Sequence, residues 1–144
     1  MMKFVGQPVA TFTGRGAFSQ TLKEARARQS EARAEMVTLV ERSKVAGCPL
    51  YLQVHVRPNA TRELRWRYRN GQHVLWEAAQ GQLATLPLAI QKHCESLNKR
   101  SRELFAMDAM CEHVAKWCAS VLEQKAMRKR SPVAPNTTVS AAKW

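Results

Sequence analysis

Residues 63–71 read Glu-Leu-Arg-Trp-Arg-Tyr-Arg-Asn-Gly, and this stretch decides the fold. Successive side chains of a β-strand point to opposite faces, so the alternation separates an apolar face from a basic one. The two sets are Leu64, Trp66 and Tyr68 against Arg65, Arg67 and Arg69. Asn70–Gly71 is a strong hairpin signal because both residues tolerate positive φ. The stretch therefore predicts a strand over Glu63–Arg69 that ends in a tight turn, with its aromatic residues in the core.

Further strands are predicted on both sides of this stretch. Leu50–Val56 alternates in the same way, with Leu52, Val54 and Val56 on its apolar side. Residues 57–61 read as the connecting turn, and residues 72–76 as a short third strand. We expect an antiparallel meander with one apolar face, which packs on helices, and one polar, basic face.

Helices are predicted before and after the meander. Apolar residues recur at helical spacing from a start near Ser19 to Lys44, and Gly47 and Pro49 end this helix. A short helix is expected over residues 77–83, and residues 88–128 form one long helix or two joined near residues 98–101. The predicted fold class is α+β, with a long N-terminal helix, a three-stranded antiparallel β-meander and a long C-terminal helix (or two), the helices being paired antiparallel.

The length of 144 residues suits one domain of ordinary size. Residues 1–16 lack periodicity and are predicted to be a flexible N-terminal arm, residues 17–130 a single α-βββ-α domain, and the proline-containing residues 131–144 a disordered tail. No apolar run reaches the roughly 18 residues of a membrane span. The first sixteen residues carry no recognisable secretory signal. We therefore expect a soluble, cytoplasmic protein without a membrane partner.

The charge balance indicates a partner that carries phosphates. The sequence has 23 Lys plus Arg against 11 Asp plus Glu, a formal net charge of +12, and the excess is spread along the chain. Such a balance is typical of proteins that bind nucleic acid. It also suits an acidic protein or an anionic membrane surface, and these alternatives stay open on charge alone.

The arginine row of residues 65, 67 and 69 is the main candidate site. Side chains on one face of a strand lie about 6.5–7 Å apart, close to the spacing of phosphates along a nucleic-acid strand. Guanidinium groups bind phosphate in a bidentate manner and read guanine edges. His55 and Arg57 near the first strand and His73 on the third widen this surface, and the two histidines could face each other across strands. The alternative is a solvated strand face that pairs with acidic residues of the first helix.

Two further basic clusters lie on the last predicted helix, one near its middle and one at its end. Cations at a helix C-terminus also favour the helix dipole, so the second cluster has a structural explanation too. The complete set of predicted nucleic-acid-binding residues is Arg57, Arg65, Arg67, Arg69, His55, His73, Lys99, Arg100, Arg102, Lys125, Arg128, Lys129 and Arg130.

Nothing in the sequence indicates an enzyme. Asp108 is its only aspartate, and it has no glycine-rich phosphate loop, nucleophile elbow or metalloprotease helix motif. Its four cysteines lack the spacing of a zinc site, so we expect reduced core residues, with no metal and no cofactor.

Parts of the predicted meander resemble small uncharacterised proteins of bacterial integrating conjugative elements, plasmids and genomic islands, some of which are described as integrase regulators. The resemblance covers residues 48–104, and the matching segments are Tyr51-Leu-Gln-Val-His-Val-Arg57, Leu64-Arg-Trp-Arg67, His73-Val-Leu-Trp76 and Leu83-Ala-Thr-Leu-Pro87. It implies a context of DNA recombination, transfer or element defence, and it implies no catalytic residues.

These observations predict a basic, nucleic-acid-binding accessory or regulatory protein of a mobile element, with DNA favoured over RNA. The alternative is a protein-interaction module, such as an inhibitor or a subunit of a larger nucleoprotein complex. The sequence leaves open whether the chain forms a homodimer through its long helices.

Overall fold

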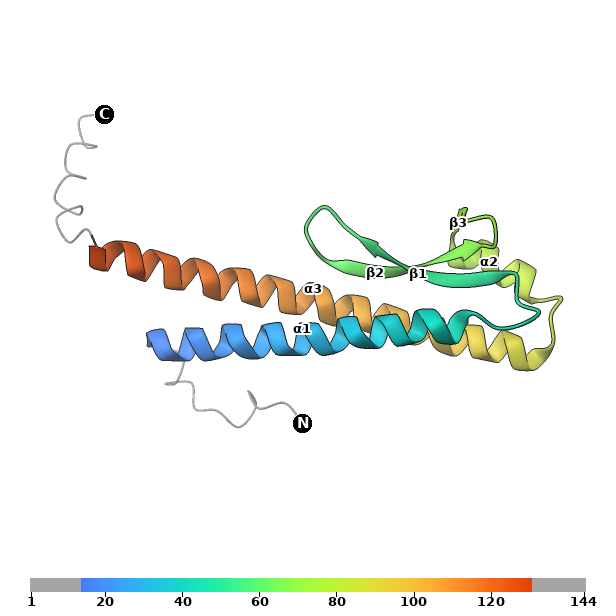
Figure 1. The fold of residues 1–144 in the computed structure, drawn as a ribbon, viewed down its shortest axis with the longest axis horizontal. Coiled ribbons are helices and arrows are strands. Elements are labelled where there is room, and N and C mark those ends of the chain that lie inside the picture. Colours follow the sequence, from blue (N-terminus) through green and yellow to red (C-terminus); the bar gives the residue numbers. More distant parts are fainter. Residues whose placement is uncertain (1–13, 131–144) are drawn as a thin grey trace, which may run out of the picture. The chain divides into compact units, whose positions relative to one another are not determined.

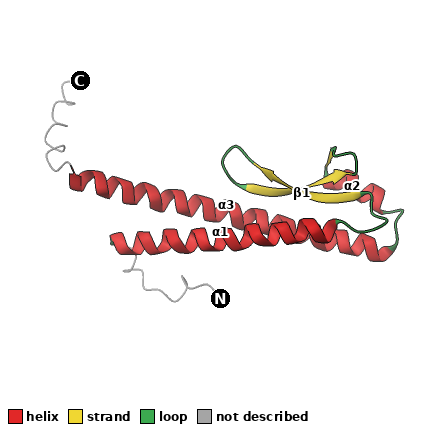
Figure 2. Cartoon of the chain, viewed as in Figure 1, coloured by secondary structure: helices red, strands yellow, loops and turns green. Residues whose placement is uncertain are grey.

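The computed structural model describes residues 14–130 of the chain (Figure 1). Its elements, in chain order, are α1 Arg15–Ser43, β1 Leu50–Val56, β2 Arg62–Tyr68, β3 His73–Val74, α2 Trp76–Leu83 and α3 Leu88–Arg130. Figure 2 separates the helices from the strands by colour. This order confirms the predicted α+β fold with its long helices and three-stranded antiparallel sheet. Most of the predicted N-terminal arm and all of the predicted tail lie outside the described residues.

The chain divides into two compact units. Residues 26–112 form one unit, which contains the whole sheet, and residues 14–25 and 113–130 are the described part of the other. Along residues 14–130, no helix combines the length and the apolar character that crossing a membrane requires.

Helix α1 begins four residues earlier than predicted. The Gly14 carbonyl accepts hydrogen bonds from the backbone N–H groups of Ala17 and Phe18, at 3.2 and 3.3 Å, so the first turn forms before Ser19. Ser19, near which the sequence predicts the start, is therefore inside the helix. The C-terminal end of the helix is as predicted, because Gly47 adopts a φ of 83° and lets the chain reverse toward β1.

The sheet has the strand order β1-β2-β3, and both strand pairs are antiparallel. Leu52, Trp66 and Val74 stand opposite one another across the three strands on the face toward the core. Strand β3 is shorter than predicted and pairs only with Trp66 and Arg67 of β2. The part of β2 before Trp66 therefore has no strand partner on that side.

The core of residues 26–112 lies between the apolar face of the sheet and the two long helices. These helices run side by side in opposite directions within this unit, as predicted, since Arg42 of α1 meets His93 of α3 and Glu35 meets Arg100 (Figure 1). The fully buried members with the largest side chains are Met36, Leu50, Leu52 and Leu104. Val56 was predicted on the core face but is 59 % exposed, because it stands opposite Arg62 at the end of the ladder.

A second apolar contact is found in residues 14–25 and 113–130. Ala25, Ala115 and Cys118 are buried there, and the ring of Phe18 meets Trp117 edge-on at 5.4 Å between centroids. The helical spacing of apolar residues in α3 therefore gives buried positions in residues 113–130 as well.

A buried polar network around Asp108 joins three elements of the sheet-containing unit. Asp108 is 0 % exposed on α3, and its carboxylate accepts hydrogen bonds from Arg33 Nε of α1 at 2.6 Å and from the Arg62 backbone N–H of β2 at 2.7 Å. Arg33 also donates to the Ala60 carbonyl at 2.8 Å. One carboxylate therefore fixes the β1–β2 turn against both long helices.

Ala60 adopts a φ of 70° in that turn, a left-handed conformation that costs a residue with a Cβ about 1 kcal/mol or more. We expect Ala60→Gly to raise the free energy of unfolding by about 0.5–1 kcal/mol, since glycine removes this strain and keeps the carbonyl that Arg33 binds. Urea unfolding monitored by circular dichroism measures the change. Gly71→Ala is the opposite control, because Gly71 has a φ of 91°, and it should lower stability by about 1 kcal/mol. If the Ala60→Gly protein and the parent have the same free energy of unfolding, the backbone of Ala60 is not strained in the parent.

Candidate nucleic-acid interface

The outer face of the sheet gathers polar side chains from all three strands. The register places Arg67 between Tyr51 of β1 and His73 of β3, and it places Arg65 opposite Gln53. Side chains that stand opposite one another on one face of an antiparallel sheet are close neighbours. The face therefore presents two arginines of the central strand with hydrogen-bonding or aromatic groups beside them.

Arg65 and Arg67 are each held by a contact through one guanidinium nitrogen. Arg65 Nε lies 2.9 Å from a carboxylate oxygen of Glu63, two residues before it on the same face, and Arg67 Nη1 donates to the Gly71 carbonyl at 2.7 Å. Both side chains are half-buried. The partner of Arg65 is therefore not an acidic residue of α1, which was the alternative considered from the sequence.

Arg69 does not belong to the row. Strand β2 ends at Tyr68, whose N–H donates to the Gln72 carbonyl as the hairpin closes, so Arg69 lies in the turn and leaves the strand alternation. Its guanidinium donates to the Cys48 carbonyl at 2.8 and 3.1 Å and to the Val45 carbonyl at 3.3 Å. The predicted row of three arginines is reduced to two, and Arg69 stabilises the loop between α1 and β1.

The first strand contributes less to this face than predicted. His55 stands opposite Glu63, and β1 is not a neighbour of β3, so His55 and His73 do not face each other. Arg57 follows the end of β1 and lies with its guanidinium carbon 5.4 Å from the ring centroid of Phe105, on α3. Arg57 Nη1 also lies 3.3 Å from Oε1 of Glu63. Glu63 is thus shared by Arg57 and Arg65.

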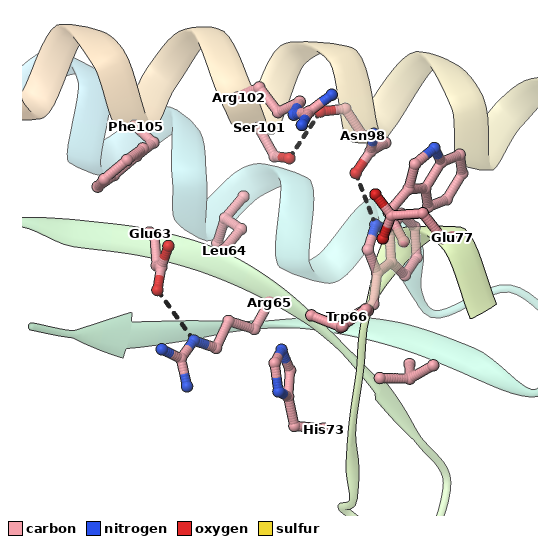
Figure 3. A pocket seen from close by; sticks show the side chains of 13 residues that line it. Glu63, Leu64, Arg65, Trp66, His73, Glu77, Asn98, Ser101, Arg102 and Phe105 are labelled. Carbon is pink, nitrogen blue, oxygen red and sulfur yellow. Dashed lines mark hydrogen bonds and ion pairs between the residues drawn. The ribbon is translucent and has the colours of Figure 1, made fainter. Parts of the chain in front are cut away.

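A pocket of about 630 Å³ lies beside the unpaired part of β2 (Figure 3). Its lining residues come from β2, from the segment that runs from β3 into α2, and from α3: Glu63, Leu64, Arg65, Trp66, His73, Val74, Leu75, Trp76, Glu77, Asn98, Ser101, Arg102 and Phe105. Three predicted binding residues, Arg65, His73 and Arg102, are brought together around it. In Figure 3, Arg102 projects from α3 on one side, while Arg65 and His73 lie on the side of the sheet.

Two tryptophans form one end of this pocket. Trp66 is buried, and its ring stacks on that of Trp76 with 5.5 Å between centroids and 29° between planes. Trp66 Nε1 donates to Asn98 Oδ1 at 3.0 Å. The hydrogen bond and the stacking fix the orientation of Trp66, which confirms its predicted place in the core.

The basic residues near the middle of α3, which are Lys99, Arg100 and Arg102, have different roles. Arg100 forms hydrogen bonds to both carboxylate oxygens of Glu35 and to Glu103, and these contacts raise the pKa of its guanidinium. The same pairing lowers the pKa of the Glu35 carboxyl, with Arg100 as its largest cause. Arg100 therefore connects the two long helices, whereas Lys99 and Arg102 are exposed.

The basic cluster at the end of α3 lies in the other unit, together with Phe18. Lys125 Nζ is 5.2 Å from the centroid of that ring, and Arg128 is exposed. The side chains of Lys129 and Arg130 lie outside the described residues.

The four cysteines are all free thiols, and three of them are buried. Cys48 Sγ and Cys94 Sγ lie 3.8 Å apart in the core. Burial, together with the neighbouring Cys48, raises the pKa of the Cys94 thiol to about 12. Because the thiolate is the reactive form, the three buried cysteines act as apolar core residues, as predicted, whereas Cys111 is half-buried.

Sequence reasoning missed the pocket, because no strand pattern shows where a neighbouring strand stops. Trp76 is predicted at the end of the third strand but begins α2. Asn98 is predicted inside a long helix or at a junction of two, and Phe105 inside a helix, so neither pattern indicates a pocket. One signal was available, since Trp76 and the helical residues after it leave little room for a full-length third strand.

Comparisons with protein-family models, with curated proteins and with solved structures found no match for this chain.

Proposed function

We propose that this chain binds nucleic acid as an accessory or regulatory protein of a bacterial mobile element, in DNA recombination, transfer or defence. The mobile-element context, and with it the choice of DNA over RNA, is supported by the sequence resemblance of residues 48–104. The binding proposal is carried by one observation, which is the register of the sheet. It sets Arg65 and Arg67 in the middle of the outer face, beside Gln53, Tyr51 and His73.

The charge of this face favours an anionic ligand. Arg65 and Arg67 of this face share its acidic residue Glu63 with Arg57, which follows the end of β1, so these four residues carry a net charge of 3 − 1 = +2. The neighbouring side chains of Gln53 and His73 add hydrogen-bonding capacity. Phosphate oxygens are bound by this combination of arginine and polar side chains in many nucleic-acid complexes.

The contacts that hold the two central arginines also prepare them for a ligand. Each of the two side chains is oriented through one nitrogen, Nε in Arg65 and Nη1 in Arg67, and a guanidinium has five N–H donors. The donors left for an incoming phosphate are on the terminal Nη atoms, because Nε of Arg65 meets Glu63 and Nε of Arg67 is buried. Because each side chain is already oriented, it loses less conformational entropy when it binds.

The proposal is tested by replacing both central arginines. We expect Arg65→Gln with Arg67→Gln to weaken binding to a labelled oligonucleotide about ten-fold or more at low salt, and to reduce the slope of log K against log salt by about two. Fluorescence anisotropy at several salt concentrations measures both quantities. Circular dichroism shows whether the variant keeps its helices and strands.

A matched control carries the same loss of charge elsewhere. Arg42→Gln with Lys44→Gln also lowers the net charge from +12 to 12 − 2 = +10, at two exposed positions near the end of α1. If both double variants lose affinity equally, overall charge and not the sheet face accounts for the binding. If the parent protein binds neither single-stranded nor duplex DNA at low salt, and instead copurifies with a stoichiometric protein after nuclease treatment, the protein-interaction alternative replaces this proposal.

A further inference from the structure

The pocket beside β2 has features that the arginine face alone does not require. A surface that binds only phosphates needs cations, whereas this pocket has a volume of about 630 Å³ and apolar aromatic walls. Its volume falls within the range of about 300–1,000 Å³ that is usual for small-molecule sites. The pocket exists because β3 stops after two residues and leaves the edge of β2 open toward α3.

Two half-buried aromatic rings line the pocket. Trp76 stacks on the buried Trp66. Phe105 lies on α3 (Figure 3). Phe105 already has the guanidinium of Arg57 over its ring, so one of its faces meets a cation. Flat aromatic side chains of this kind stack on nucleobases, and they do so with little dependence on base identity.

The polar groups of the lining suit the edge of a base. Asn98 accepts the Trp66 N–H through its Oδ1, which fixes the amide so that its NH₂ group is left to donate. Glu77, in the first turn of α2, is an exposed carboxylate that can accept from the amino group of adenine, cytosine or guanine. Glu63, the other acid of the lining, is already paired with two arginines.

Two arginines and His73 lie where the phosphates of such a nucleotide would leave the pocket. Arg102 stands on the α3 side, and Arg65 and His73 on the sheet side, where the pocket meets the outer face (Figure 3). Among residues 14–130, Arg102 makes no ion pair or side-chain hydrogen bond. A strand whose backbone follows Arg65 and Arg67 therefore passes the opening of the pocket.

From this arrangement we infer that the pocket receives one unpaired nucleobase, so that the protein prefers single-stranded nucleic acid to a duplex. This inference rests on the proposed function, because the arginine face supplies the backbone contacts. A base inside a duplex is stacked and paired on both sides, and it reaches such a pocket only after it is extruded at a cost.

The test compares ligands that differ only in their bases. Full-length protein is titrated with a labelled single strand, with a strand of equal length in which every base is replaced by an abasic unit, and with the duplex. We expect the abasic strand to bind about ten-fold or more weakly than the strand with bases, which corresponds to the stacking of a single base. The duplex should also bind more weakly than the single strand at equal salt.

A variant then tests whether the preference for the base-containing strand over the abasic strand comes from the pocket. Phe105→Leu removes the flat ring but keeps an apolar side chain, so it should reduce the ratio between the base-containing and abasic strands several-fold without changing the affinity for the abasic strand. Met110→Leu is the control on the same helix, at a position that is 63 % exposed and outside the pocket lining, and it should leave the ratio unchanged.

The possible results separate the two proposals. Equal binding of the abasic and base-containing strands, or tighter binding of the duplex, overturns the base pocket and leaves the proposed function standing. Absence of binding to every ligand at low salt overturns both. If Phe105→Leu fails to fold, the abasic comparison in the parent protein still decides whether a base is bound. Photocrosslinking of an iodouracil-containing strand then shows where the base binds. Attachment at Trp76 or Phe105 supports the pocket, and attachment at Tyr51 alone overturns it.

Discussion

Asp108→Asn should lower the free energy of unfolding by about 3 kcal/mol, one of the largest effects of any single substitution in this chain. The carboxylate is buried and accepts from the Arg33 guanidinium at 2.6 Å and from the Arg62 N–H at 2.7 Å. An amide is neutral and offers one acceptor oxygen, so it cannot satisfy both donors with the same strength. Arg33, whose side chain is 23 % exposed, would then keep only the more distant carboxylate of Glu112, at 4.0 Å from its Nη2. Urea unfolding, followed by circular dichroism, measures the loss.

The control is the same chemical change at an exposed position of α3. Glu103→Gln removes an ion pair between Glu103 and Arg100 that lies three residues apart on the helix surface. Such exposed pairs contribute only about 0.3–0.5 kcal/mol, so this variant should be nearly as stable as the parent. The role assigned to Asp108 is refuted if the two amide variants show similar stability.

Leu52→Ala should lower the free energy of unfolding by about 3 kcal/mol, because Leu52 is 0 % exposed and stands opposite the buried Trp66. Removal of a fully buried leucine costs the transfer energy of its methyl groups and a further amount for the cavity that remains. The slope of the free energy against urea concentration should stay unchanged if the native fold is retained.

Val56 supplies the comparison on the same strand. It shares the alternation of Leu52 but is exposed, so Val56→Ala should cost less than about 0.5 kcal/mol. A large loss of stability at Val56, or a small one at Leu52, would mean that the sheet packs on the helices over a different part of its face.

The contrast between Leu52 and Val56 shows what the sequence pattern can predict. Alternation identifies the face to which a side chain points, and it correctly paired Leu52 with the core. It contains no information on where the helices end or diverge from the sheet. Val56 belongs to the apolar face by its alternation. It stands opposite Arg62, however, at the end of the β1–β2 ladder, where the sheet no longer packs on the helices.

The candidate site was predictable to a similar degree. Arg65 and Arg67 were placed on the outer face by alternation alone, and the register agrees. Arg69 follows the same spacing but lies one residue beyond the strand, where the turn directs it to the Cys48 carbonyl. The pocket depends on where β3 stops and on which residues of α3 pass the β2 edge, and both are tertiary properties. The Asp108 network could not be predicted either, since the spacing of Arg33, Arg62 and Asp108 along the chain has no periodicity.

The Asp108 network also has a consequence for the order in which the chain folds. Its three contributing segments are separated by up to 75 residues between Arg33 and Asp108, so closing it carries the entropy cost of a long loop. During synthesis, α1 and the β1–β2 hairpin leave the ribosome while the carboxylate that joins them has not yet been made. Until that moment the Arg62 N–H at the hairpin edge and the Arg33 cation can bond only to water or to transient partners. The hairpin is therefore expected to dock late, when the middle of α3 arrives, and folding should be slower than the high helix content alone would suggest.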